Sequence, residues 1–359
     1  MITISVCMIV KNEEDVIGRC LDCIESFADE IIIVDTGSND RTKEVAAQYT
    51  DKIYDFEWIN DFAAARNFSF SKGTKDYLMW LDADDIIDKK NRRALQELKR
   101  TLDTAVDMVM MKYDVAFDEH NNPTISYYRE RLVKRSMNYR WVSEIHEVLE
   151  PHGNILRSPI AISHKKVRPT EPGRNLKIFQ SMIQNGKKLD SRQHFYYARE
   201  LCNNGLIKEA IEEFNNFLNE GKGWVENNIS ACLDLANCYN KTGQKSEAME
   251  ALFKSFLYDE PRAEICCEIA KYFFEKNDYI IAIFWYKLAS ERPMKDENGA
   301  FVIKDRYGLL PYLQICVCYD RLGDYEKAKK YNEMAGKIKP NNRAYLINKK
   351  YFDEMKKKR

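Results

Sequence analysis

Two halves of this chain differ in the spacing of their apolar residues, and this difference limits the folds that the chain can adopt. From Met1 to about His164, short apolar runs alternate with segments of helical period, and the runs include ISVCMIV, EIIIVD and YLMWL. Apolar strands separated by helices are typical of a mostly parallel sheet with helices on both faces. We therefore predict an α/β domain over residues 1–166.

The second half repeats one helical pattern four times, in YARELCNNGLIKEAIEEF, DLANCYNKTGQKSEAMEAL, EIAKYFFEKNDYIIAIFWY and QICVCYDRLGDYEKAKKYN. Each copy has a turn residue followed five positions later by alanine: Gly205 and Ala210, Gly243 and Ala248, Asn277 and Ala282, Gly323 and Ala328. The pattern resembles tetratricopeptide repeats, whose period is about 34 residues. It predicts an all-α repeat domain over residues 191–359, joined to the first by a linker and connecting helix at 167–190. A β-hairpin insertion is expected around Glu297, Asn298 and Gly299.

The composition excludes several classes of protein. Lys and Arg total 56 and so do Asp and Glu, so the net charge is zero and no overall field attracts nucleic acid or an anionic membrane. The first apolar run is too short for a transmembrane segment and has no basic leader. Most of the ten cysteines lie in apolar patterns, which favours reduced thiols and a cytoplasmic protein. Cys20 and Cys23 form a C-x-x-C without a second ligand pair, which disfavours a zinc or redox site.

Polar motifs follow the predicted strands of the first half. Lys11 and Asn12 come after the first strand, Asp35 comes after the second, and the sequence Asp82-Ala83-Asp84 ends the most apolar strand. Ligands bind at the carboxyl ends of the strands in open α/β sheets. Carboxylates at such an end suit a hard divalent cation that bridges phosphates, so Asp82 and Asp84 are candidate metal ligands.

In this order the motifs, together with Arg66 and Asn67, resemble the family 2 glycosyltransferases, which have the Rossmann-like GT-A fold. The resemblance implies a UDP-sugar donor and a Mn²⁺ or Mg²⁺ cofactor. Asp35 would accept hydrogen bonds from the uracil or ribose, Asp84 would bind the metal, and Asp82 would face the ribose or the metal. Arg66, Asn67, Lys11 and Asn12 would lie near the nucleotide, where an arginine can neutralise diphosphate.

Two later segments carry further candidates. Inverting transfer needs a base that takes the proton of the acceptor. We expect Glu147 in the sequence WVSEIHEVL to be this catalytic base, with Glu144 and His146 as alternatives, because the family's common Glu-Asp form is absent there. Some GT-A enzymes complete the metal shell with a late histidine, and His164 at the end of the last predicted strand is placed for it.

The sequence Ile145-His146-Glu147, the late strand that ends in histidine and the repeats together resemble a narrower group, the sublancin-type bacterial peptide S-glycosyltransferases. That resemblance implies a hexosyltransferase acting on a Cys or Ser of a peptide or protein, which the helical repeats would help to hold. Two alternatives stay open, namely transfer to lipopolysaccharide core, flagellin or another envelope glycan, and a non-catalytic tetratricopeptide scaffold. The open ends of a repeat array are also natural places for a homodimer contact.

Overall fold

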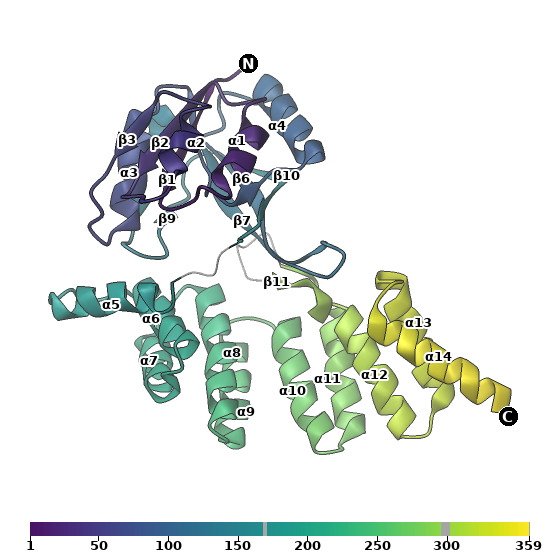
Figure 1. Cartoon of the computed structure of the whole chain (residues 1–359). Coiled ribbons are helices and arrows are strands. Elements are labelled where there is room, and N and C mark those ends of the chain that lie inside the picture. Colours follow the sequence, from purple (N-terminus) through teal and green to yellow (C-terminus); the bar gives the residue numbers. More distant parts are fainter. Residues whose placement is uncertain (168–170, 296–301, 359) are drawn as a thin grey trace. The chain divides into compact units, whose positions relative to one another are not determined.

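The computed structural model describes residues 1–167, 171–295 and 302–358. The chain divides into two compact units, the first running from Met1 to Lys188 and the second beginning at Leu189. The first unit holds the sheet, and the described residues of the second are helical apart from one short strand (Figure 1). No helix of these described residues is both long and apolar enough to cross a bilayer.

The first unit alternates strands and helices, as the sequence predicted. Its strands are β1 (Ile4–Val10), β2 (Glu30–Asp35), β3 (Ile53–Asp55), β4 (Tyr77–Trp80), β5 (Asp85–Ile86), β6 (Met108–Phe117), β7 (Pro123–Lys134), β8 (Trp141–Val142), β9 (Val148–Leu149) and β10 (Ile155–His164). Its helices are α1 (Ile17–Ile24), α2 (Thr42–Ala46), α3 (Phe62–Lys72), α4 (Lys89–Thr101) and α5 (Arg174–Gln184). Helix α5 lies in the segment predicted as linker and connecting helix, of which residues 168–170 lie outside the described residues.

The main sheet has the strand order β3-β2-β1-β4-β7-β6-β10-β5. Strand β1 pairs in parallel with β2 and β4, β2 pairs in parallel with β3, and β6 pairs in parallel with β10. Strand β7 runs antiparallel to β6, because a polar turn joins the two strands as a hairpin. It also runs antiparallel to β4 on its other side. The predicted mostly parallel sheet is therefore confirmed, with β7 reversed near its centre and the short β5 reversed at its edge beside β10.

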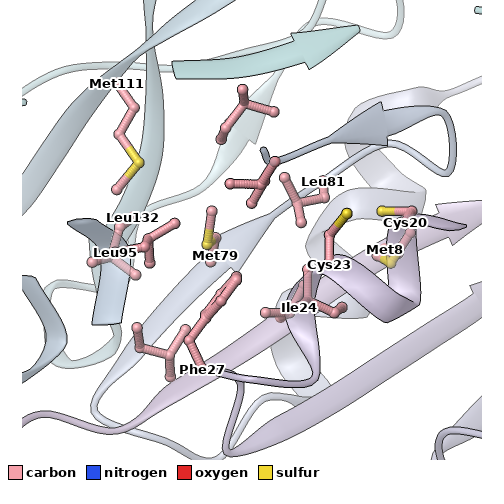
Figure 2. Packing of buried hydrophobic residues seen from close by; sticks show 14 of the residues in the cluster. Met8, Cys20, Cys23, Ile24, Phe27, Met79, Leu81, Leu95, Met111 and Leu132 are labelled. Carbon is pink, nitrogen blue, oxygen red and sulfur yellow. The ribbon is translucent and has the colours of Figure 1, made fainter. Parts of the chain in front are cut away.

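Both faces of the sheet are covered, because side chains alternate along each strand. Val6 and Met8 of β1 pack with α1 and α4 on one face, whereas Cys7 packs with α3 on the other. Figure 2 shows the first of these clusters, in which Cys20 and Cys23 of α1 lie among aliphatic and aromatic side chains. Both thiols are free and buried, so the C-x-x-C acts as part of the apolar core.

Glu30 ties three segments of the sheet together at the start of β2. Its buried carboxylate accepts hydrogen bonds from Ser5 Oγ and from the backbone and side chain of Thr74, and it pairs with Lys52. Burial opposes ionisation, but the contacts with Lys52, Ser5 and Thr74 outweigh it and lower the pKa of Glu30 to about 2. The stabilisation by this carboxylate is therefore complete above pH 4.5, its ordinary pKa, and is lost as the pH falls towards 2.

Replacing Glu30 with Gln is expected to lower the free energy of unfolding by about 2 to 3 kcal/mol at pH 7. The variant should also lose less stability than the wild type between pH 4.5 and pH 2, since it has no carboxylate to protonate at this position. Urea denaturation at pH 7, 4 and 3 measures both effects. An equal loss of stability with acid in the two proteins would contradict this role of Glu30.

The second unit consists of helical hairpins. Its helices are α6 (Ser191–Asn203), α7 (Ile207–Glu220), α8 (Val225–Lys241), α9 (Lys245–Lys254), α10 (Ala263–Glu275), α11 (Tyr279–Glu291), α12 (Leu309–Arg321), α13 (Tyr325–Ile338) and α14 (Arg343–Lys358), and its short strand is β11 (Val302–Ile303). The predicted turn residues all have positive φ, at 80° for Gly205, 80° for Gly243, 61° for Asn277 and 78° for Gly323. The alanine five positions after each turn is buried in every copy.

These features are those of the predicted tetratricopeptide-like repeats. Glycine and asparagine adopt the left-handed turn at low cost, and the buried alanine lets the two helices of a hairpin approach closely. The all-α repeat fold is therefore confirmed. The expected β-hairpin around residues 297–299 lies outside the described residues.

Candidate active site

Polar side chains gather at one edge of the sheet, beyond the carboxyl ends of β1, β2 and β4. These three strands are parallel neighbours, so the residues that follow them meet at the same edge. Asn12 follows β1, Asp35 ends β2, and Asp82 lies two residues after β4. This is the arrangement that the sequence predicted for a ligand site.

A cluster of acids and one histidine forms at this edge. Ligand atoms of Asp82, Asp85 and His164 all lie within 4.8 Å of one another. His164 is far from these acids in the sequence. The antiparallel pairing of β5 with β10 places it opposite Asp85. Its Nδ1 lies 3.1 Å from Asp84 Oδ1 and 3.3 Å from Asp85 Oδ1. The structure thus brings together the three predicted metal residues, Asp82, Asp84 and His164, and adds Asp85.

Asp85 is the buried anchor of this cluster. Its Oδ1 accepts a hydrogen bond from the Tyr113 hydroxyl at 3.0 Å, and its Oδ2 accepts one from the backbone N–H of Asp82 at 3.1 Å. Arg131, which has no exposed side-chain surface, pairs with Asp85 Oδ2 at 3.1 Å and stacks on Trp80, 3.6 Å from the ring centroid. Because both oxygens already have partners, Asp85 is suited to holding His164 and the loop after β4 in place.

The charged groups of the cluster shift the pKa values of Asp82 and His164. Burial favours the neutral form of Asp82, but Arg66 and Arg131 outweigh it and hold the pKa of this carboxyl well below its ordinary value. Burial likewise opposes the charge of His164, whereas hydrogen bonds to Asp84 and Asp85 raise its pKa to about 10. The negative charge concentrated here is therefore balanced by neighbouring guanidinium and imidazolium groups.

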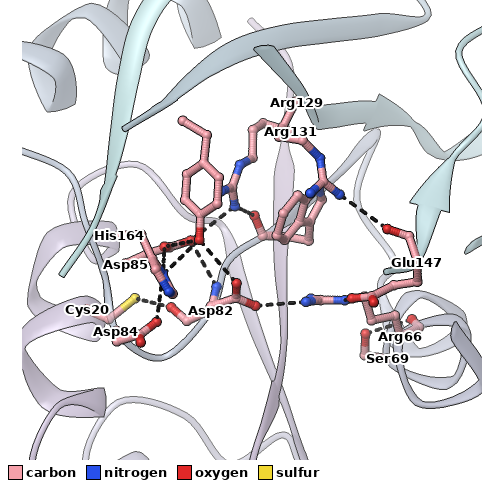
Figure 3. Close-up of polar contacts among 12 residues, drawn as sticks. Cys20, Arg66, Ser69, Asp82, Asp84, Asp85, Arg129, Arg131, Glu147 and His164 are labelled. Atoms are coloured by element: carbon pink, nitrogen blue, oxygen red, sulfur yellow. Dashed lines mark hydrogen bonds and ion pairs between the residues drawn. The ribbon is translucent and has the colours of Figure 1, made fainter. Parts of the chain in front are cut away.

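Arg66 on α3 links the acid cluster to the loop that carries the predicted base. Its Nη2 donates to Asp82 Oδ1 at 2.8 Å, and its Nε donates to Glu147 Oε1 at 2.6 Å. The guanidinium also lies near two indoles, 4.8 Å from the Trp80 centroid and 4.9 Å from that of Trp141. Figure 3 shows Asp82 between the histidine on one side and Arg66 on the other, with Glu147 beyond. A guanidinium held on several sides has one fixed orientation.

The loop between β8 and β9 carries all three candidate bases, and they have different surroundings. Glu147 faces Arg66, as described above, and its side chain is 13% exposed. Glu144 pairs instead with Lys187, and His146 stacks on Phe179 of α5 with ring centroids 6.3 Å apart. Arg66 joins Glu147 to Asp82 of the acid cluster.

The same loop holds two residues with positive φ that are not glycine. Ser143 has φ 76° and His146 has φ 53°. Such residues cost of order 1 kcal/mol or more each and persist where the surrounding contacts demand them, which is frequent at functional sites. The strain is therefore consistent with a loop shaped to present Glu147.

The residues predicted to contact the nucleotide lie partly at the ends of β1 and β2 and partly on α3. Asp35 is buried, and its Oδ1 accepts hydrogen bonds from the backbone N–H groups of Gly37 at 2.9 Å and Ser38 at 2.8 Å. Its Oδ2 is buried without a hydrogen-bond partner among the described residues. Asn12 bridges the same loop, since its Oδ1 accepts from Asn39 N at 2.8 Å, and the neighbouring Lys11 is exposed.

Asn67 has a structural partner. Its amide exchanges two hydrogen bonds with the backbone of Trp141, both at 2.9 Å, and so fixes β8 against α3. The predicted Arg-Asn pair is thus placed at the site, with Arg66 on two carboxylates and Asn67 on a strand. A direct contact of either residue with a nucleotide stays a prediction.

Sequence reasoning missed four members of the site: Asp85, Tyr113, Arg129 and Arg131. The guanidinium of Arg129 stacks on Trp80 at 5.0 Å and donates to the backbone oxygen of Glu147 at 3.4 Å. The available signal was the pair Arg129 and Arg131 within a predicted strand, because two charges on one face of a central strand need partners.

Residues 5–161 match the family model described as Glycosyl transferase family 2. The first unit is a family 2 glycosyltransferase domain. This agrees with the family that the ordered motifs resemble, and the match covers the main sheet of the first unit almost to the end of β10.

Several curated relatives are similar to part of this chain. A TPR repeat-containing protein of Synechococcus elongatus is 32% identical over 151 residues, which are 42% of this chain and 36% of the relative. The SPbeta prophage-derived glycosyltransferase SunS of Bacillus subtilis is 26% identical over 237 residues, which are 61% of this chain and 54% of the relative. The chain therefore spans about half or less of the length of these relatives.

A third relative is matched over more of its own length. The lipopolysaccharide core biosynthesis glycosyltransferase LpsC of Rhizobium meliloti is 27% identical over 232 residues, which are 59% of this chain and 85% of the relative. These alignments agree with a family 2 domain that is followed by tetratricopeptide-like helices.

Proposed function

We propose that this protein is an inverting, metal-dependent glycosyltransferase that moves a sugar from a UDP-sugar to a peptide or protein acceptor. The observation that carries the proposal is the cluster of Asp82, Asp84 and His164 at the strand ends of a family 2 domain. It lies at the edge of the sheet where α/β domains bind their ligands.

The environment of Asp35 supports a nucleotide at this edge. A buried carboxylate oxygen without a donor is costly, because it has lost water and gained no hydrogen bond. The uracil N–H or a ribose hydroxyl of the donor would supply the missing hydrogen bond to Oδ2. Lys11 and Asn12, in the adjoining loop after β1, would lie beside the nucleotide.

The donor atoms in the cluster fit Mn²⁺ or Mg²⁺. Carboxylate oxygens with one imidazole suit such ions, and the described polar contacts of His164 all use Nδ1. A metal-binding histidine commonly gives one ring nitrogen to a carboxylate while the other binds the ion. Asp82, Asp84 and His164 would hold the ion, and Asp85 would orient the histidine. When bound, the cation would supply positive charge to stabilise the leaving diphosphate.

Glu147 would act on the acceptor. As the acceptor nucleophile attacks the anomeric carbon and the bond to UDP breaks, the Glu147 carboxylate takes the proton of the nucleophile. Arg66 would hold this carboxylate in a fixed orientation. A cysteine acceptor needs less assistance than a serine, because the pKa of a thiol is nearer neutrality.

The tetratricopeptide-like helices support a peptide or protein acceptor, because helical repeats present extended binding surfaces. The alignment with the glycosyltransferase SunS spans 237 residues, against the 157 between positions 5 and 161. LpsC supports the alternative, a sugar acceptor in lipopolysaccharide core, since 85% of its length is matched. Incubating the protein and a radiolabelled UDP-sugar with cysteine- and serine-containing peptides or with lipopolysaccharide separates the two. Label in the peptide fraction supports our proposal, and label only in the lipopolysaccharide fraction would replace it with the alternative.

The decisive test of the activity is UDP release from a panel of UDP-sugars, with and without Mn²⁺ or Mg²⁺. We expect one donor to be turned over only with the metal. Asp84→Asn should reduce this rate on the order of 100-fold or more, because a ligand of the ion is lost. Asp88→Asn is the matched control, since Asp88 caps α4 and asparagine caps as well as aspartate.

Two outcomes would count against the proposal. An equal loss of rate in both variants would show that Asp84 has no special part in catalysis. Failure to turn over any donor, combined with failure to bind UDP by calorimetry in the presence of Mn²⁺, would favour the non-catalytic scaffold instead.

A further inference from the structure

Two cysteines of the repeat unit lie against each other. The thiol of Cys238 on α8 donates to the sulfur of Cys202 on α6, with the Sγ atoms 3.3 Å apart, although the cysteines are all free. A disulfide joins its sulfurs at about 2.05 Å, so these two need to approach by only about 1 Å to bond. The family 2 domain and its chemistry make no use of this pair.

The pair is held in register by a second contact. Arg199 on α6 lies 3.1 Å from Asp234 on α8, and these two residues precede the cysteines by about one helical turn on each helix. Two contacts in succession along the same helix faces oppose sliding of α6 past α8. The packing of α6 against α8 therefore holds the two thiols next to each other.

The two thiols differ in exposure and in charge environment. Cys202 is partly exposed, whereas Cys238 is completely buried. The hydrogen bond from Cys238, assisted by the ammonium of Lys241 at 3.8 Å, outweighs burial and the charge of Asp234 and lowers the pKa of Cys202 to about 6. By contrast, burial raises the pKa of Cys232 on the same helix to about 12. A partly exposed thiolate beside a buried thiol is the arrangement of an attacking and a resolving cysteine.

We propose that Cys202 and Cys238 form a redox-active thiol pair, which a peroxide oxidises to a disulfide joining α6 to α8. The Cys202 thiolate attacks one oxygen of hydrogen peroxide, the O–O bond breaks, and a sulfenic acid and water are produced after protonation. Cys238 then attacks the sulfenic sulfur, the S–S bond forms, and the hydroxide that leaves takes the proton of Cys238 to become water. Overall, two thiols are oxidised and one peroxide is reduced to two waters.

The test uses the full chain, reduced and then freed of reductant. After treatment with stoichiometric hydrogen peroxide and alkylation of the remaining thiols, peptide mass mapping should find one cross-link between Cys202 and Cys238. The intact protein should be about 2 Da lighter before alkylation, and dithiothreitol should reverse the change. Recovery of both cysteines in alkylated form while other thiols are oxidised would overturn the proposal.

Variants separate the two roles. Cys238→Ser should stop at a sulfenic acid on Cys202 that dimedone captures, whereas Cys202→Ser should leave Cys238 reduced at the same dose. Lys241→Met should slow the reaction on the order of tenfold near neutral pH, because the thiolate loses its neighbouring charge. Cys316→Ser, on α12, is the matched control and should form the cross-link like the wild type. Equal capture by dimedone at both positions would contradict the assignment of roles.

Discussion

Replacing Glu147 with Gln is expected to lower kcat for sugar transfer by about 10²- to 10⁴-fold, which is the range that a positioned general base contributes. The substitution keeps the shape of the side chain and leaves an oxygen that can still accept from Arg66 Nε, so the loop should hold its position. It removes the capacity to take a proton. The KM for the UDP-sugar should change little, because Glu147 is proposed to act on the acceptor.

Glu144→Gln is the matched control for this experiment. Glu144 lies in the same loop, three residues earlier, but its carboxylate pairs with Lys187. We expect this variant to keep kcat within a few-fold of the wild-type value. Steady-state rates of acceptor glycosylation for the two variants decide between the candidates, and a large loss in Glu144→Gln with a small one in Glu147→Gln would assign the base to Glu144.

An acceptor with a lower pKa gives a second measure of the same role. If Glu147 takes the proton, its loss should matter less for a thiol than for a hydroxyl, since a thiol ionises more readily in water. The rate ratio of wild type to Glu147→Gln should therefore be smaller with a cysteine peptide than with the matching serine peptide. Equal ratios would show that Glu147 contributes by some means other than proton transfer.

The sequence predicted the strands and the edge at which they place the site, because both follow from local patterns. Continuous apolar runs predict strands, and the acids that follow them mark the carboxyl ends. Asp82, Asp84 and His164 could be named for this reason. Each lies at the end of a strand that is visible in the sequence, even though His164 is about eighty residues from the other two.

The contacts that hold these residues could not be predicted in the same way. In the sequence Asp85 is one more acid after Asp82-Ala83-Asp84, and only the pairing of β5 with β10 places it opposite His164. Arg131 lies in a predicted strand, but its side chain is buried against Asp85 and Trp80, which belong to other parts of the chain. Register between distant strands is a tertiary property, so a single sequence with no alignment does not contain a local signal for it.

The role of Arg66 was only partly predictable for the same reason. The sequence indicated an arginine near the nucleotide, and its partner Asp82 was already a candidate. Trp80 comes from β4, the strand that follows α3, but Trp141 in β8 and Glu147 in the loop after β8 lie far from α3 in the sequence. In the structure Arg66 therefore positions two carboxylates. Its contribution to the free energy of unfolding can be measured.

Arg66→Met is expected to lower the free energy of unfolding of the first unit by about 3 to 5 kcal/mol, the usual cost of removing one partner from a buried ion pair. Arg66 is 7% exposed, and its loss would leave the carboxylates of Asp82 and Glu147 without their shared cation. The contacts with Trp80 and Trp141 would lose their electrostatic part. Urea denaturation followed by tryptophan fluorescence measures the change, since both indoles flank the site.

A surface arginine is the control for this measurement. Arg41 pairs with Glu44, but both side chains are more than two-thirds exposed, so Arg41→Met should leave the stability close to that of the wild type. Adding Glu147→Gln to Arg66→Met should recover part of the lost stability, because one unpaired buried charge is then removed. If Arg66→Met were no more harmful than Arg41→Met, the guanidinium would not be the cation that holds Asp82 and Glu147 together.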